Sequence, residues 1–200
     1  MKKLVCITGM DGTGKSTLVG LLAEAYPQAH VANIWDLLDS GEQSLPFKSK
    51  RDIDAFLCAL TPDSRLLFLA HALKYSIDLA VASQKELVIA NAYFYKYFAT
   101  ELALGAQPRL VEALQESFPE PDLVVELALP PTEAAGRKTV LSRYECGLAN
   151  PPNTASFLAF QKKASAGWAG FQRHNWHQLD ARQRPQALFE KTVSLINALP

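Results

Sequence analysis

The sequence predicts an α/β fold in which a parallel five-stranded sheet has helices on both faces. Short apolar runs typical of strands alternate with longer segments of helical periodicity. This is the pattern of repeated βαβ units, whose strands are parallel. No internal repeat, low-complexity tract or long linker divides the 200 residues, so we expect one domain over residues 1–200.

Five runs are expected to form the strands, because each is short and rich in β-branched or other apolar residues. They are Lys3–Thr8, His30–Ile34, Glu86–Ala90, Asp122–Leu129 and Trp176–Leu179. The segments between them are long enough for helical crossovers, so we expect the strands to be parallel.

The expected helices are segments in which apolar residues recur every three or four positions. They are Lys15–Ala25, Asp52–Leu60, a long helix from Pro62 to about Ser83, stretches on both sides of Pro108, Pro131–Ser142, Thr154–His174 with interruptions at Gly167 and Gly170, and Pro185–Ala198. Thr61 precedes Pro62 and is expected to cap the long helix. A polar turn is expected around Ser40 and Gly41.

Charge is balanced over the whole chain and unevenly distributed along it. There are 20 Lys and Arg against 20 Asp and Glu, so the net charge predicts no attraction to nucleic acid or membrane. Residues 137–184 contain eight basic and two acidic residues, a net charge of +6, whereas residues 101–136 contain one basic and seven acidic residues, a net charge of −6. The basic segment suits a triphosphate and leaves a polynucleotide partner such as DNA open.

The sequence contains no apolar run of transmembrane length. The apolar run that follows Lys2 and Lys3 is too short for a signal peptide. The three cysteines, Cys6, Cys58 and Cys146, show no C-x-x-C spacing and no disulfide framework. We therefore expect a cytoplasmic protein with reduced thiols and no membrane partner.

A phosphate-binding loop connects the first expected strand to the first expected helix. Its residues, Gly9-Met10-Asp11-Gly12-Thr13-Gly14-Lys15-Ser16, fit the pattern G-x-x-x-x-G-K-[ST]. Glycines let such a loop turn tightly and direct its N–H groups at phosphates, and the lysine neutralises the β- and γ-phosphates. We therefore expect a P-loop NTPase type of fold, ATP bound by residues Gly9–Thr17, and Mg²⁺ at the hydroxyl of Ser16.

The sequence supports neither of two other classes of P-loop protein. A GTPase would normally have an N/T-K-x-D motif, and the sequence has none. A mechanical ATPase would normally end a strand in an acidic residue. Here the third expected strand is followed by Asn91, and Glu126 lies within the fourth.

Several segments resemble thymidylate kinases. The loop Ile7–Thr17 (ITGMDGTGKST) is similar to that of the family, which has an aspartate at the position of Asp11. The other similar segments are Leu66–Ala70, Pro121–Leu123, Arg137, Ser142–Glu145 and Leu179–Ala181. The resemblance implies a nucleoside monophosphate kinase-like fold, an enzyme that uses ATP and Mg²⁺, and a homodimer.

The same resemblance implies roles for single residues. Phe68 would stack on the acceptor base, and Asp11 would contact a sugar hydroxyl. Residues 136–152 would form a lid, in which Arg137 would bind the nucleotide and Arg143 would neutralise charge in the transition state. We expect Lys138, beside them, to lie on a solvated face.

The acceptor side departs from the pattern of the family at three places. Where the family has Asp-Arg-Tyr, this chain has Asn91-Ala92-Tyr93, and Ala72 stands where an arginine would read the base. Residues 35–38 replace a Thr-Arg-x-Pro-Gly type of loop. A dianionic phosphate loses much of its binding without a bidentate arginine. We therefore predict that the acceptor is a nucleotide or nucleotide-like compound other than ordinary dTMP.

An uncharged hydroxyl acceptor needs a carboxylate to orient it and to accept its proton. Asp11 and Asp36 are the candidates, the second because it follows a strand at the edge where open α/β sheets bind ligands. Asp36 is equally suited to capping a helix, and both interpretations stay open. Asn91 at a strand end is expected to orient a magnesium-bound water. Tyr93 is the member of the run Tyr93-Phe94-Tyr95-Lys96-Tyr97-Phe98 that we assign to the substrate, and the other aromatic residues are assigned to packing.

The favoured function is phosphoryl transfer from MgATP, with Asp11 or Asp36 acting on the acceptor, Lys15 and Ser16 on the donor and metal, and Arg143 on the transition state. Three alternatives stay open. One is a thymidylate kinase with a rebuilt phosphate clamp. Another is a kinase of a modified base hydroxyl, such as hydroxymethyluracil, in DNA. The third is a pseudoenzyme that binds nucleotide without transferring phosphate.

Overall fold

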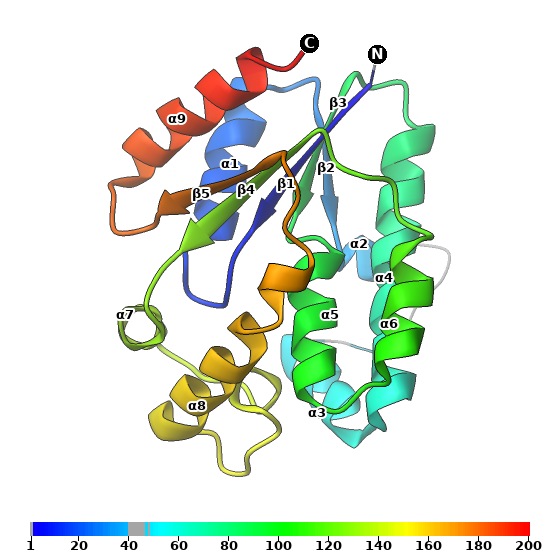
Figure 1. The fold of residues 1–200 in the computed structure, drawn as a ribbon, viewed down its shortest axis with the longest axis vertical. Coiled ribbons are helices and arrows are strands. Elements are labelled where there is room, and N and C mark those ends of the chain that lie inside the picture. Colours follow the sequence, from blue (N-terminus) through cyan, green and yellow to red (C-terminus); the bar gives the residue numbers. More distant parts are fainter. Residues whose placement is uncertain (1, 40–46, 48) are drawn as a thin grey trace.

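A five-stranded parallel sheet in the order β2-β3-β1-β4-β5 forms the centre of the computed structural model, which describes residues 2–39, 47 and 49–200 (Figure 1). Its strands are β1 (Lys3–Thr8), β2 (His30–Asn33), β3 (Leu87–Asn91), β4 (Leu123–Ala128) and β5 (Trp176–Asp180). Val5 of β1 pairs with Ile89 of β3 on one side and with Leu123 of β4 on the other. The predicted parallel five-stranded α/β fold is confirmed.

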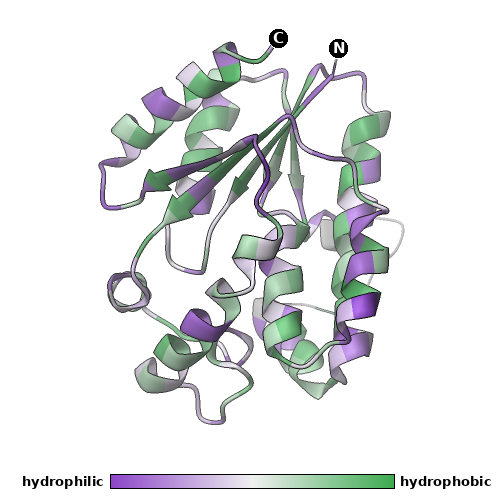
Figure 2. Cartoon of the chain, in the orientation of Figure 1, coloured by the Kyte–Doolittle hydropathy of each residue, from purple (hydrophilic) through white to green (hydrophobic). Residues whose placement is uncertain are grey.

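Helices cover both faces of the sheet (Figure 1). They are α1 (Lys15–Ala25), α2 (Asp36–Asp39), α3 (Lys50–Ala59), α4 (Pro62–Ala82), α5 (Phe94–Ala103), α6 (Pro108–Gln115), α7 (Pro131–Gly136), α8 (Thr154–Ser165) and α9 (Pro185–Asn197), with short 3₁₀ turns η1 (Tyr144–Cys146) and η2 (Trp168–Gly170). Leu4 and Cys6 of β1 lie in a core shared with α4 and α5, whereas Val5 and Ile7 lie in a core shared with α1 and α9. Figure 2 shows the strands largely in hydrophobic colours, as expected for a sheet that is buried on both faces.

Three local features differ from the expectation. Helix α7 ends at Gly136 rather than at Ser142, and the N–H groups of Arg137 and Lys138 close tight turns onto Ala134 and Ala135. Helix α8 ends at Ser165, before the first interrupting glycine. The short helix α2 was not expected at all. The predicted turn at residues 40–41 lies outside the described residues.

The carboxyl ends of the strands meet at one edge of the sheet, and α3, α5 and α8 lie beyond that edge (Figure 1). The two chain ends lie together near the opposite edge. Ligands of open parallel sheets bind at the carboxyl edge, where connections leave neighbouring strands in opposite directions. Here that place is β1, which lies between β3 and β4. Among the residues described, no helix is both long and apolar enough to span a bilayer.

Candidate active site

The loop after β1 has the conformation that only its glycines allow. Gly9, Gly12 and Gly14 have φ angles of 137°, 85° and 97°, in the region that residues with a Cβ rarely occupy. A Cβ on Gly9 would lie 2.6 Å from the carbonyl oxygen of Leu127, and one on Gly12 would lie 2.7 Å from that of Ala134. The sequence pattern therefore has a steric cause.

Unpaired backbone donors make this loop fit a triphosphate. In the part of the chain that the structure describes, the N–H groups of residues 12–16 donate to no protein acceptor. The side chain of Thr13 is instead bonded within the loop, its hydroxyl donating to the carbonyl of Met10 at 3.0 Å. Unpaired N–H groups at the start of α1 form an anion site at the positive end of the helix dipole. The residues present thus fit ATP.

Lys15 lies folded over the loop and almost fully buried. Its Nζ donates to the carbonyl of Met10 at 2.6 Å. Burial and then the neighbouring charge of Lys96 lower the pKa of Lys15 to about 7, and Asp11 opposes this shift. An anion bound beside Lys15 would favour its charged form. Ser16 and Thr17 face the same cavity, and the hydroxyl of Ser16 is the group that would ligate Mg²⁺ there.

A cavity of about 760 Å³ crosses the carboxyl edge of the sheet, with the loop at its middle. We call the side toward β5 and the lid-like segment the donor end, and the side toward β2, β3 and α3 the acceptor end. Gly9 and Met10 shape the loop without lining this cavity, whereas residues 11–17 line it.

Residues far apart in the chain form the donor end. Arg137 donates from Nη2 to the carbonyl of Ala181 at 2.9 Å, which ties the segment after α7 to the turn after β5. Lys138 forms an ion pair with Glu145 at 2.9 Å and faces the cavity rather than open solvent. The cations of this end could neutralise a bound triphosphate.

Two amides, two aromatic residues and one aliphatic pair line the acceptor end. They are Asn33, Asn91, Trp35, Tyr97, Ile53 and Leu57. Asn91 therefore lies where the sequence predicted, at the end of β3 and facing the cavity. Ala92, which follows it, has a φ of 59° and occupies the position at which the thymidylate kinase pattern has an arginine.

Asp11 forms an ion pair with a residue that the sequence had not singled out. Its Oδ1 lies 2.5 Å from the Nζ of Lys96, in the first turn of α5. Burial by itself would raise the pKa of Asp11, but the charges of Lys96 and Lys15 outweigh it, so the pKa is lowered. The same pairing outweighs burial at Lys96 and raises the pKa of that lysine.

The sequence offered one signal for Lys96. It is the single charged residue in the aromatic run 93–98, where a charge needs a partner if the run is buried. Asp54 of α3 was also missed and also lines the cavity. No local pattern marks Asp54, because α3 comes close to the loop only in the folded chain.

Three predicted acceptor residues do not line the cavity. The Oδ2 of Asp36 accepts hydrogen bonds from the hydroxyl of Ser76 at 2.7 Å and from the N–H of Asn33 at 2.8 Å. This geometry favours the structural interpretation of Asp36, since its carboxylate holds the turn after β2 against α4.

Phe68 and Tyr93 lie in packed aromatic groups and are not among the residues that line the cavity, so the structure gives no support to their predicted contact with substrate. The ring of Phe68 lies 5.1 Å from that of Phe56 and 6.3 Å from that of Phe47. Tyr93 is fully buried, and its hydroxyl donates to the carbonyl of Pro119 at 2.8 Å. Burial raises the pKa of Tyr93 well above its usual value. The other aromatic residues of the run are buried too, as predicted.

Arg143, predicted to act on the transition state, does not line the cavity. Its Nε is buried and has no hydrogen-bond partner among the described residues. The next residue, Tyr144, is bonded instead, donating its hydroxyl to Glu101 at 2.8 Å and its N–H to Asp54 at 3.1 Å. The lid-like segment is thus attached to α3 and α5 beside the cavity.

Several known proteins with similar sequences are named as thymidylate kinases or probable thymidylate kinases. No protein-family model matches the chain. The probable thymidylate kinase 1 of Saccharolobus solfataricus is 26% identical over 200 residues, covering 98% of this chain and 97% of that protein. The probable thymidylate kinase of Sulfurisphaera tokodaii is 26% identical over 205 residues, covering 100% and 98%.

The fold agrees with a solved structure of the same kind. A thymidylate kinase from Candida albicans superimposes with a TM-score of 0.71 at 18% identity, covering 98% of this chain and 91% of that chain. The chain is thus thymidylate kinase-like in sequence and fold, and these similarities support the prediction of a kinase.

Proposed function

We propose that this thymidylate kinase-like chain transfers the γ-phosphate of MgATP to a nucleotide or nucleotide-like acceptor other than ordinary dTMP. One observation carries the proposal. A complete phosphate loop lies beside an acceptor end that has no arginine among its described lining residues. The described lining residues thus suit a phosphate donor, whereas none of those at the acceptor end is the bidentate arginine that best binds a monophosphate.

The proposed role of each residue follows from its position in the cavity. The N–H groups of the loop and Lys15 would bind the β- and γ-phosphates, Ser16 would ligate Mg²⁺, and Arg137 would bind the nucleotide at the donor end. When bound, MgATP supplies the phosphoryl group. Asp11 would orient the acceptor, and Asn91 would orient a water bound to the metal. Arg143 would reach the transferring group only if the lid-like segment 136–152 moved.

Cellular context completes the proposal. Cys6, Cys58 and Cys146 are free thiols, which fits the reducing cytoplasm. A homodimer is proposed from the resemblance alone.

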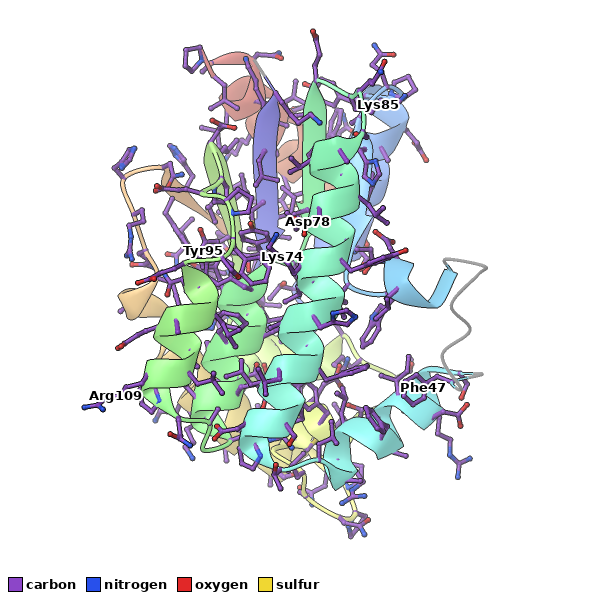
Figure 3. All side chains as sticks on the ribbon, turned by 90° about the vertical axis from the view of Figure 1, so that its right-hand side faces the viewer. Phe47, Lys74, Asp78, Lys85, Tyr95 and Arg109 are labelled. Atoms are coloured by element: carbon purple, nitrogen blue, oxygen red, sulfur yellow. The ribbon has the colours of Figure 1, made fainter. Side chains whose placement is uncertain are left out.

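Label transfer from γ-labelled ATP tests the proposal. We expect label on a nucleoside, a nucleotide or hydroxymethyluracil-containing DNA, and slow transfer to dTMP. Lys15→Ala should lower kcat/KM by on the order of 10²-fold or more, because it removes a charge that stabilises the transition state. Lys85→Ala is the matched control, since Lys85 is exposed in the loop between α4 and β3 (Figure 3), and this variant should leave the rate unchanged.

Different experimental results would contradict different parts of the proposal. Fast turnover of dTMP would overturn the altered acceptor and leave the kinase. Tight ATP binding without transfer to any acceptor of the panel would indicate a pseudoenzyme. An unchanged rate in Lys15→Ala would overturn the role of the loop.

A thymidylate kinase with a rebuilt clamp is the second candidate, because one observation favours it. Lys96 brings a cation to the acceptor end, and the relatives that span the whole chain are named thymidylate kinases. In that case Lys96→Met should abolish the turnover of dTMP.

A further inference from the structure

The two ends of the cavity differ in charge. The charged residues that line it are Asp11 and Lys15 in the loop at its middle, Arg137, Lys138 and Glu145 at the donor end, and Asp54 and Lys96 at the acceptor end. Cations outnumber carboxylates at the donor end, whereas the described acceptor end has one of each. The first arrangement suits a triphosphate, whereas the second offers a dianion no excess of positive charge.

The one lining cation at the acceptor end of the described structure already has a partner. Lys96 and Asp11 are 2.5 Å apart, with side chains only 12% and 16% exposed. Its neighbours Tyr95 and Tyr97 are buried, so the first turn of α5 holds the ammonium in place. The ammonium also lies 5.1 Å from the ring centroid of Tyr97. A phosphate ester would have to compete with Asp11 for this cation.

The remaining polar groups of the acceptor end suit hydroxyl and amino groups. The Oδ1 of Asp54 accepts the N–H of Tyr144, and its Oδ2 has no donor among the described residues. Asn33 accepts a weak bond from the N–H of Trp35 at 3.4 Å, which leaves its amide donor for a ligand. Trp35 and Tyr97 add aromatic faces beside these groups, as required to bind a base.

We propose that the acceptor end recognises a base-bearing compound whose reacting end is an uncharged hydroxyl, with Lys96 as the residue that positions Asp11 for it. The inference rests on the proposed function and deepens it by naming the substrate class. Both a free nucleoside and a nucleotide within a strand carry this chemistry.

The step balances with the groups present. The acceptor hydroxyl oxygen forms a bond to the γ-phosphorus, and the bond from that phosphorus to the β–γ bridging oxygen breaks. The bridging oxygen keeps the electron pair and leaves as part of ADP. The hydroxyl proton passes to Oδ2 of Asp11, while Lys96 keeps its bond to Oδ1.

Matched ligand pairs test the charge of the acceptor. Each of the common nucleosides is compared with its own 5′-monophosphate, by calorimetric binding in the presence of MgADP and by label transfer from ATP. We expect at least tenfold tighter binding and at least tenfold higher kcat/KM for the uncharged member of the best pair. A hydroxymethyluracil nucleoside compared with the same base in an oligonucleotide separates the free source from the strand.

Substitutions of Lys96 test its role as a positioning residue. Lys96→Met should lower kcat by roughly tenfold or more with little change in the KM for ATP. Without the ammonium, burial raises the pKa of Asp11, so the acidic limb of the pH profile should move to higher pH. Lys15 and Lys138 also face Asp11, and Tyr97 and Glu145 also face Lys96; all four stay in place in both proteins. Lys96→Arg should restore most of the rate.

Two further variants complete the test. Lys74→Met is the matched control, because Lys74 lies on the exposed face of α4 and pairs with Asp78 (Figure 3), and it should leave rates and pH profile unchanged. Ala92→Arg places a guanidinium at the strand end and should shift the preference toward the monophosphate by at least tenfold. The φ of 59° at Ala92 strains both side chains about equally.

The outcomes separate the two proposals. A monophosphate preferred by the wild type, with that preference lost in Lys96→Met, would overturn the inference and leave a kinase that uses Lys96 as its phosphate clamp. An unshifted pH profile in a folded Lys96→Met protein would overturn the positioning role. Binding of neither member of any pair would also overturn the inference. ATP binding with no transfer to any acceptor would instead overturn the proposed function.

Discussion

At the scale of single residues, the function of the loop depends on glycines that a side chain would displace. Gly12 combines a φ of 85° with a position in which a Cβ would lie 2.7 Å from a carbonyl oxygen of α7. Gly12→Ala should therefore destabilise the protein by about 1–2 kcal/mol and weaken ATP binding by roughly tenfold or more. Chemical denaturation and calorimetry measure the two effects.

Gly20→Ala is the matched control for this substitution. Gly20 lies exposed within α1, and a Cβ there would meet no atom within 4 Å. Alanine is the better helix former, so the variant should be more stable by about 0.5–1 kcal/mol and should bind ATP unchanged. Equal effects of the two substitutions would contradict the steric explanation.

At the scale of elements, two helices that begin with good capping residues differ in how they are capped. Asn153 starts α8 with a capping box, in which its side chain accepts the N–H of Ser156 at 2.9 Å and the hydroxyl of Ser156 accepts the N–H of Asn153 at 3.1 Å. Thr61 precedes α4, but its hydroxyl donates to that of Ser64 and forms no capping bond with the backbone.

Alanine substitutions at Asn153 and at Thr61 should differ in their effect on the free energy of unfolding. Asn153→Ala should lower the free energy of unfolding by about 1 kcal/mol, since it removes the acceptor of a helix N–H group. Thr61→Ala should change it by about 0.5 kcal/mol or less. Thermal unfolding of both variants measures the difference. A larger loss of stability in Thr61→Ala than in Asn153→Ala would contradict the observed cap geometry.

At the scale of the whole molecule, one buried ionic network joins four parts of the chain. The Nε of Arg65 on α4 donates to both carboxylate oxygens of Glu101 on α5, at 3.0 and 2.9 Å, and both side chains are fully buried. The guanidinium also donates to the carbonyls of Leu57 and Leu60 at the end of α3. Tyr144 brings the segment after α7 to the same carboxylate.

Breaking this network should lower the free energy of unfolding far more than breaking an exposed ion pair. Burial raises the pKa of Glu101 to about 6, against the opposing effects of Arg65 and Tyr144, so the carboxylate is ionised at neutral pH. Glu101→Gln leaves the guanidinium without its counter-charge and should destabilise the protein by about 3–5 kcal/mol. Denaturant unfolding at pH 7.5 measures this loss.

The exposed ion pair of α4 provides the control for that prediction. Lys74 and Asp78 are 37% and 58% exposed, and their stacking along the helix surface is visible in Figure 3. Lys74→Met should therefore change stability by about 0.5 kcal/mol or less. A loss in Glu101→Gln no larger than that in Lys74→Met would show that the buried network contributes little.

Features that neighbouring residues encode could be predicted from the amino-acid sequence. The alternation of apolar runs and helical periodicity predicted the parallel sheet, because burial on both faces leaves its mark within each strand. The phosphate-binding loop could be predicted because all its phosphate-binding groups are contiguous in the sequence. Even Asn91 was placed correctly, since a strand end is a local feature.

Which side chains meet across the cavity could not be predicted from the sequence and became clear from the folded chain. Phe68 and Tyr93 had the right type and position in the chain, but packing turned Phe68 toward Phe47 and Phe56 and buried Tyr93. Asp11 and Lys96 are 85 positions apart. They meet because the loop follows β1, α5 follows β3, and these two strands are neighbours in the sheet. Long-range contacts depend on how elements pack, and no local pattern of residues encodes that packing.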